Sequence, residues 1–411
     1  MPRKTIIIFI VVFLLVGAIM LGAYSYFKNT SSPTADPNAS LYQKFNPFGT
    51  STKNPSGTGE GDTTTSTTTG ETEKPVSKFY QISNFGISGA AFLEDNRKVT
   101  QGDSTTEPTY EVVPSVRYVE RATGHIYQTY LDTKVTGTIS NSTIPGVYEV
   151  LFDGLANSTI YRYPSTDGLG ITSFLATLGG SSSFLPTNIL SVSLSPDKTS
   201  FFSITKGKNG VIGTIKSFDS SKNNQVFTSS FSEWLPQWVT NTNIYLTTKP
   251  TYLVEGSVFN LNTTNGTLSK LFGGIPGLTT LANGDGNYVL FGASLDTGPT
   301  LNVFDIKNHI SIDLGVYGLP EKCVWSKDNV NVYCAVPNTI VGTQYPDTWY
   351  QGLTSFTDYF VKINTETKEV STLANSQNET GVDATNLFLN DKEDKLFFTN
   401  KKDYTFWSLD L

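Results

Sequence analysis

The sequence predicts an all-β fold for most of this 411-residue chain. From residue 77 onward, short apolar or alternating runs rich in Val, Ile, Thr, Phe and Tyr are separated by turns of Asn, Asp, Gly and Ser. The hairpins that these runs form recur at a nearly constant spacing. The first 76 residues differ in kind, because they hold one apolar run and one polar, low-complexity stretch.

The apolar run covers residues 6–23, which are 18 residues without a charge. As a helix, this run and its flanks cross a hydrocarbon core about 30 Å thick. Arg3 and Lys4 precede it, so the positive-inside rule places the N-terminus in the cytoplasm and the rest outside. We therefore expect residues 1–27 to form a cytoplasmic tip and a transmembrane helix inserted in the lipid bilayer. A cleaved signal peptide is the alternative, and it exports the same domain.

Residues 28–77 are rich in Thr, Ser, Gly and Pro and contain few apolar side chains. Such a stretch cannot bury enough surface to offset the entropy lost on ordering. We expect a flexible tether with a root-mean-square reach of about 40 Å. The chain would thus be a single-pass protein of the cell membrane with an extracytoplasmic domain over residues 78–411.

A repeat organises that domain. Its units contain two hairpins each, and the polar turns of one hairpin series lie at steps of mostly about 42–55 residues. Those turns fall near residues 124, 167, 222, 265, 307 and 367. Four strands per unit at this period indicate the blades of a β-propeller. The sequence therefore predicts seven blades, each a four-stranded antiparallel sheet.

The expected blades cover residues 86–141, 142–186, 187–234, 235–276, 277–320, 321–380 and 381–411. The last unit holds only three strands. Residues 78–83 precede the first unit and lack a partner of their own. We expect them to close the ring as the fourth strand of the seventh blade, which would remove an open sheet edge.

Two turns carry a family resemblance. Ser195-Pro196-Asp197-Lys198 and Ser326-Lys327-Asp328-Asn329 partly match the Ser-Pro-Asp-Gly turn that precedes an apolar strand in TolB-like and WD-repeat-like bacterial propellers. Over residues 78–411 the chain resembles these families. The resemblance implies a ring-shaped interaction domain and no particular ligand, since a fold does not determine a function.

The two cysteines flank one predicted hairpin turn symmetrically. In a two-residue hairpin around Asp328 and Asn329, Cys323 and Cys334 would lie directly opposite each other. An exported domain permits a disulfide. Two buried free thiols are the equal alternative, because a single bulge would place the side chains on opposite faces.

The sixth unit contains a long insertion at residues 337–359. Its candidate partner-binding residues are Tyr345, Asp347, Trp349, Tyr350 and Tyr359, because Tyr and Trp supply large contact areas at low entropic cost. The first unit has an enlarged connection at residues 100–114. We expect both connections to project from one face and to wall a groove over the seventh blade. Alternatively, the insertion folds down onto its own blade.

Composition limits the function. The net charge is −7, and residues 78–411 hold 23 basic and 31 acidic residues, which argues against binding nucleic acid. Two His, two Cys and no catalytic motif lead us to expect no catalytic residue, no metal site and no cofactor.

The sequence thus favours a non-enzymatic interaction module of the cell envelope, with a protein or glycan partner. A second hypothesis is a propeller-type glycosidase or lyase that uses the carboxylates of Asp347 and Glu111. A third is a purely structural component of an envelope assembly.

Overall fold

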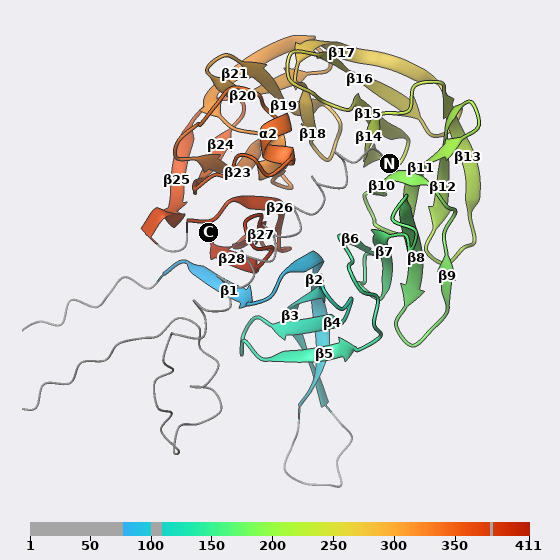
Figure 1. The fold of residues 1–411 in the computed structure, drawn as a ribbon. Helices are drawn as coiled ribbons and strands as arrows, with labels where there is room; N and C mark the ends of the chain where they lie inside the picture. Colours follow the sequence, from blue (N-terminus) through green and yellow to red (C-terminus); the bar gives the residue numbers. More distant parts are fainter. Residues whose placement is uncertain (1–76, 100–108, 379–380) are drawn as a thin grey trace, which may run out of the picture. The chain divides into compact units, whose positions relative to one another are not determined.

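Seven four-stranded antiparallel sheets surround a common axis (Figure 1). The computed structural model describes residues 77–99, 109–378 and 381–411. The first strand of each sheet is innermost, and the inner strands of several neighbouring blades contact one another. The prediction of an all-β, seven-bladed propeller is confirmed.

The blades follow the chain order. Blade 1 holds β2 (Ile87–Val99), β3 (Thr109–Glu120), β4 (Ile126–Tyr130) and β5 (Thr136–Ser140). Blade 2 holds β6 (Glu149–Phe152), β7 (Ser158–Pro164), β8 (Ile171–Thr177) and β9 (Ser182–Phe184). Blade 3 holds β10 (Ile189–Leu194), β11 (Ser200–Gly207), β12 (Gly210–Ser217) and β13 (Asn223–Ser229). Blade 4 holds β14 (Trp234–Thr240), β15 (Asn243–Thr248), β16 (Glu255–Asn262) and β17 (Leu268–Pro276).

The remaining blades include three short helices. Blade 5 holds β18 (Thr279–Ala282), β19 (Tyr288–Leu295), β20 (Gly298–Asp305) and β21 (Ile310–Tyr317). Blade 6 holds β22 (Cys323–Trp325), β23 (Asn331–Pro337), β24 (Asp358–Asn364) and β25 (Val370–Asn375). Blade 7 holds β26 (Ala384–Leu389), β27 (Lys395–Asn400), β28 (Phe406–Asp410) and β1 (Phe79–Ser83). The helices are η2 (Pro320–Lys322), α2 (Asp347–Tyr350) and η3 (Ser376–Asn378).

Pairing of β1 with β28 closes the ring, as the sequence predicts. Phe79 lies opposite Leu409, and Ser83 lies opposite Phe406. Figure 1 shows this first strand, in blue, beside the last strand, in red. Ile82 is buried between blades 7 and 1 with Phe397 and Phe406. The edge of β28 is therefore covered by a strand from the other end of the domain.

The turns that carry the family resemblance repeat one backbone conformation. Lys198 donates its backbone N–H to the Ser195 carbonyl, and Asn329 does the same to Ser326. The φ angles of Lys198 and Asn329 are 52° and 59°, in the left-handed region. Gly286, with a φ of 76°, occupies the equivalent position in blade 5. This position therefore favours glycine, and Lys and Asn are accepted there at some conformational cost.

The two faces of the ring carry different connections. Turns between the first and second strands of neighbouring blades contact one another on one face, where the Gly154 N–H donates to the Lys198 carbonyl and the Gly284 N–H to Asn329 Oδ1. Because strand direction alternates, connections between second and third strands lie on the other face, which we call the insertion face.

Two predicted segments fall outside the described residues: the transmembrane helix at residues 6–23 and, except for its last residue, the tether at residues 28–77. None of the helices in the described ranges is long and apolar enough to cross a bilayer.

Replacing Ile82 by Ala tests the ring closure. We expect it to lower the free energy of unfolding by about 2–4 kcal/mol, because it leaves a cavity where β1 joins blades 7 and 1. Gln81→Ala, at an exposed position in the same strand, is the matched control and should change stability little. Equal urea-denaturation midpoints for the two variants would contradict the role of β1.

Candidate functional site

The insertion between β23 and β24 is the largest addition to the repeat, and it spreads over the insertion face. The Asp347 carboxylate accepts hydrogen bonds from Thr251 Oγ1 at 2.8 Å and from the Tyr252 N–H at 2.5 Å. Both partners belong to the connection between β15 and β16 of blade 4. Ile340 packs closely against the backbone of Gly298 in blade 5. The insertion of blade 6 therefore crosses blade 5 and reaches blade 4.

Aromatic side chains anchor the insertion from beneath. Tyr345, Trp349 and Phe356 form a buried cluster with Leu319 from the link between blades 5 and 6. The rings of Tyr345 and Phe356 stack with their centroids 5.7 Å apart. Tyr345 and Trp349 are 0% and 3% exposed, so these two predicted binding residues hold the insertion onto the ring and present no surface to a partner. The insertion therefore folds down onto the ring, which is the second of the two arrangements that the sequence allows.

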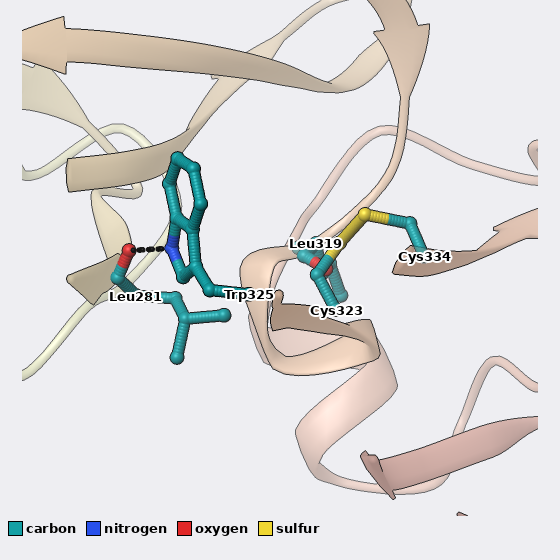
Figure 2. Close-up of a disulfide and its surroundings, with 5 residues drawn as sticks. All are labelled: Leu281, Leu319, Cys323, Trp325 and Cys334. Carbon is teal, nitrogen blue, oxygen red and sulfur yellow. Dashed lines mark hydrogen bonds between the residues drawn. A yellow bond between two sulfur atoms is a disulfide. The ribbon is translucent and has the colours of Figure 1, made fainter. Parts of the chain in front are cut away.

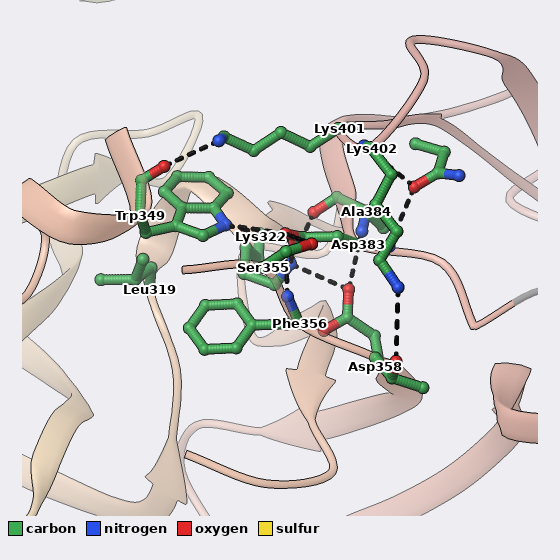
Figure 3. Close-up of polar contacts among 12 residues, drawn as sticks. Leu319, Lys322, Trp349, Ser355, Phe356, Asp358, Asp383, Ala384, Lys401 and Lys402 are labelled. Carbon is green, nitrogen blue, oxygen red and sulfur yellow. Dashed lines mark hydrogen bonds and ion pairs between the residues drawn. The ribbon is translucent and has the colours of Figure 1, made fainter. Parts of the chain in front are cut away.

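A buried lysine lies below the aromatic cluster (Figure 3). Lys322 Nζ donates to Asp358 Oδ2 at 2.8 Å, to Asp383 Oδ1 at 2.6 Å and to the Ala384 carbonyl at 2.9 Å. The three charged side chains are fully buried. Removing one partner from such a network leaves an uncompensated buried charge, which is strongly destabilising.

The Asp383 carboxylate connects this network to the insertion. It accepts hydrogen bonds from Trp349 Nε1 at 3.1 Å, from Ser355 Oγ at 3.2 Å and from the Phe356 N–H at 3.0 Å. Lys401 of blade 7 donates to the Trp349 carbonyl at 2.7 Å (Figure 3). Charge-assisted bonds of this kind fix both the backbone and the side chains of the insertion.

The charge of the network is not balanced when all groups are ionised, because two carboxylates face one ammonium. Burial raises the pKa of Asp358 to about 6, against the opposing effect of Lys322. Asp358 Oδ1 is buried without a hydrogen-bond partner among the described residues. A proton on Asp358 would therefore neutralise the cluster.

A second acidic group lies close to the surface of the insertion. The Tyr350 hydroxyl donates to Glu321 Oε1, and burial raises the pKa of the Glu321 carboxyl. Tyr350 is 40% exposed, so part of its ring faces solvent. Of the five predicted binding residues, Tyr350 is the one that presents a large surface. Asp347 is engaged by blade 4, and Tyr359 packs half-buried in β24 against the core of blades 5 and 6.

The enlarged connection of blade 1, predicted at residues 100–114, does not share a face with the insertion. Residues 109–114 belong to β3, and residues 100–108 lie outside the described residues. The strand ends that flank it, Val99 and Thr109, join the first and second strands of blade 1 and therefore lie toward the face opposite the insertion. The predicted shared groove over blade 7 is therefore wrong. Glu111 pairs with Arg97 across the β2–β3 hairpin at 2.5 Å.

The two cysteines are bonded to each other. Cys323 lies directly opposite Cys334 in the β22–β23 register, and Figure 2 shows the disulfide beside Leu319. Trp325, two residues beyond Cys323, donates its indole N–H to the Leu281 carbonyl of blade 5 at 3.0 Å. The structure thus decides between the two alternatives that the sequence left open. The disulfide ties the inner strand of blade 6 to its neighbour beside Lys322.

The insertion face also exposes large apolar side chains. The insertion and the two connections that it contacts contribute six of them, each at least 40% exposed. They are Leu253 and Val254 from blade 4, Leu295 from blade 5, and Val341, Tyr350 and Leu353 from blade 6. A concentration of exposed apolar side chains on one face is typical of an interaction surface.

Four carboxylates of this face take part in contacts within the fold, whereas Glu255 and Asp296, at the connections of blades 4 and 5, are exposed. Asp347 binds blade 4, Asp358 and Asp383 bind Lys322, and Glu321 binds Tyr350. Nowhere in the described ranges do three or more His, Cys, Asp or Glu side chains lie together so that they could hold a metal ion. Asp347 and Glu111, the carboxylates of the glycosidase or lyase hypothesis, lie on opposite faces of the ring and are not close to each other.

Comparison with known proteins shows the fold alone. Neither a protein-family model nor a curated protein matches the chain. An oligogalacturonate lyase in complex with manganese is 9% identical, covers 80% of this chain and 98% of its own, and has a TM-score of 0.50. The β-propeller domain of the Trilobed protease from Pyrococcus furiosus is 11% identical, with coverages of 79% and 94% and a TM-score of 0.47.

TolB from Acinetobacter baumannii is 13% identical, covers 62% of this chain and has a TM-score of 0.42. The match spans 61% of the TolB chain. At these low sequence identities, the comparisons transfer no activity to this protein.

The buried network is the feature that the sequence did not reveal. Lys322, Asp358 and Asp383 are far apart in sequence, and each looks like an ordinary polar residue next to a strand. The only local hint is that Lys322 directly precedes the short apolar inner strand of blade 6.

Asp358→Asn tests the network through its pH dependence. In the folded state Asp358 binds its proton more tightly than in the unfolded chain, because its pKa is raised from 3.8 to about 6. Protonation of Asp358 therefore raises the free energy of unfolding by about 1 kcal/mol as the pH falls from roughly 7 to 5. Asp358→Asn should lose this gain in urea denaturation.

Asp391→Asn is the control, because it makes the same charge change at an exposed carboxylate. If the stability difference between wild type and Asp358→Asn does not change across this pH range, the assigned protonation of Asp358 is wrong.

Proposed function

We propose that this protein is a non-enzymatic interaction module whose insertion face binds a protein partner in the cell envelope. The observation that carries the proposal is the set of six exposed apolar side chains on the blade 6 insertion and on the two connections that it contacts. Five of the six are aliphatic, which suits the apolar side chains of a protein segment better than the polar surface of a glycan.

The rigidity of this face supports the proposal. The Asp347 contact with blade 4, the aromatic cluster and the Lys322 network hold the insertion in one arrangement. A preorganised surface loses little conformational entropy when a partner binds.

We further propose that residues 6–23 anchor the chain in the membrane and that the ring is extracytoplasmic. The apolar run and the two basic residues before it support this topology. The Cys323–Cys334 disulfide supports it independently, because structural disulfides persist in oxidising compartments outside the cytosol. The tether would give the ring reach away from the bilayer.

Leu353→Glu tests the insertion face. Leu353 is 74% exposed, so a charge there should leave the fold intact and abolish binding. The measurement is chemical cross-linking of the full-length protein in native membranes, followed by comparison of the captured partners. Leu155→Glu is the matched control, because Leu155 is 72% exposed on the opposite face.

A partner that is lost with Leu353→Glu and kept with Leu155→Glu supports the proposal. If the two variants capture the same partners, the insertion face does not bind them and the proposal is wrong.

The anchor is tested by placing charge in the apolar run. Phe13→Lys combined with Leu14→Lys should release the protein from membranes under alkaline extraction, since each central lysine costs about 3 kcal/mol in a bilayer. Thr65→Lys combined with Thr68→Lys adds the same charge to the tether and should leave the protein membrane-bound. Wild-type protein in the soluble fraction would contradict the anchor.

A further inference from the structure

A cleft of about 410 Å³ lies between blades 1 and 2, away from the insertion. Its floor is one face of blade 2, where two rows of directly paired residues cross β7, β8 and β9. One row is Tyr161, Phe174 and Phe184, and the next is Thr159, Ala176 and Ser182. All of them line the cleft except Phe184, which lies beside it against the ring of Phe174. The volume falls within the usual range of small-molecule sites, about 300–1,000 Å³.

The register explains why the cleft exists. The side chains of the aromatic row are large, whereas Ala176 and Ser182 in the next row are small and leave space beside them. Blade 1 bounds the other side with Ile126 and with residues 140–144, which link it to blade 2. The cleft is thus built by side chains of two rigid blades, and it does not depend on the insertion.

The aromatic row leads from the interior to solvent. Ring centroids are 6.5 Å apart for Tyr161 and Phe174, and 5.2 Å apart for Phe174 and Phe184. Tyr161 is 4% exposed, whereas Phe184 is 70% exposed. An exposed ring that continues into a cleft offers a platform for the apolar face of a ligand.

The Tyr161 hydroxyl makes no hydrogen bond within the described part of the chain, although its side chain lines the cleft. Burial alone raises the pKa of Tyr161 to about 12. Buried tyrosine hydroxyls usually find a hydrogen-bond partner. The hydroxyl is therefore free to donate to a group that enters the cleft, or to accept from it.

The chemistry of the lining selects a class of ligand. No Asp, Glu, Lys, Arg or His lines the cleft among the described residues, so it does not favour a charged ligand. The polar groups at its margin are hydroxyls, from Ser140, Ser142, Thr143 and Ser182. Aromatic rings beside several hydroxyls match a neutral molecule that has both a C–H face and many hydroxyl groups.

We propose that this cleft binds a neutral saccharide unit. The rings of Phe174 and Phe184 stack against the C–H face of the sugar, and the Tyr161 hydroxyl makes a hydrogen bond to one of its oxygens. The site differs in place and in chemistry from the aliphatic insertion face, so the ring would hold a glycan at its rim and a protein on that face.

Saccharide titrations of the full-length protein test the proposal, in a detergent without a sugar headgroup. The probes are cellotriose, maltotriose and chitotriose, followed by ligand-observed NMR. We expect at least one to bind with a millimolar or tighter dissociation constant. Phe184→Ala should weaken binding about tenfold. Phe231→Ala removes another exposed ring and should leave binding unchanged.

Tyr161→Phe separates function from folding. Removing an unpartnered hydroxyl should keep or slightly raise the denaturation midpoint, yet weaken saccharide binding about tenfold. Absence of binding by all three probes, or wild-type binding by Phe184→Ala, overturns the proposal. So does equal binding of indole, which would assign the cleft to an apolar ligand. Leu353→Glu should bind saccharide normally. A failure of the saccharide proposal can therefore be distinguished from a failure of the proposed protein-binding function of the insertion face.

Discussion

Closure of the ring by β1 and β28 is the constraint on which the rest of this structure depends. The hydrogen bond from the Phe406 N–H to Ser83 Oγ joins residues 323 positions apart in the chain. Once that pair forms, every blade is held between two neighbours and the inner strands are fixed around one axis. The entropy of closing so long a loop grows only slowly with its length, and buried contacts such as those of Ile82 can offset it.

A closed ring allows the insertion face to be built from distant segments. Lys322 comes from the link between blades 5 and 6, Asp358 from β24, and Asp383 from the link before blade 7. Burying these charges is costly unless their partners are held at hydrogen-bond distance. The ring provides that fixed geometry, and the network in turn positions Trp349 and Phe356 under the insertion. The exposed side chains above them then form a surface of defined shape.

The same scaffold presents two surfaces of different chemistry. The insertion face is aliphatic and lies on long connections, whereas the cleft between blades 1 and 2 combines aromatic rings with hydroxyl groups on strands. Repeat architectures permit this division, because the sheet of each blade packs against the sheets beside it and can vary independently of more distant sheets. The propeller fold is compatible with many such surfaces and specifies none of them.

The sequence by itself determined the architecture: seven blades, the closing strand at residues 78–83 and the turns at Ser195 and Ser326. These features follow from local periodicity and turn chemistry, which a single chain displays directly. Only the tertiary structure decided that Tyr345 and Trp349 are buried, that Cys323 and Cys334 are bonded, and that the connection of blade 1 leaves the opposite face. Such properties depend on which segments meet in space, and spacing along the chain does not encode the meeting of Lys322 with Asp358 and Asp383.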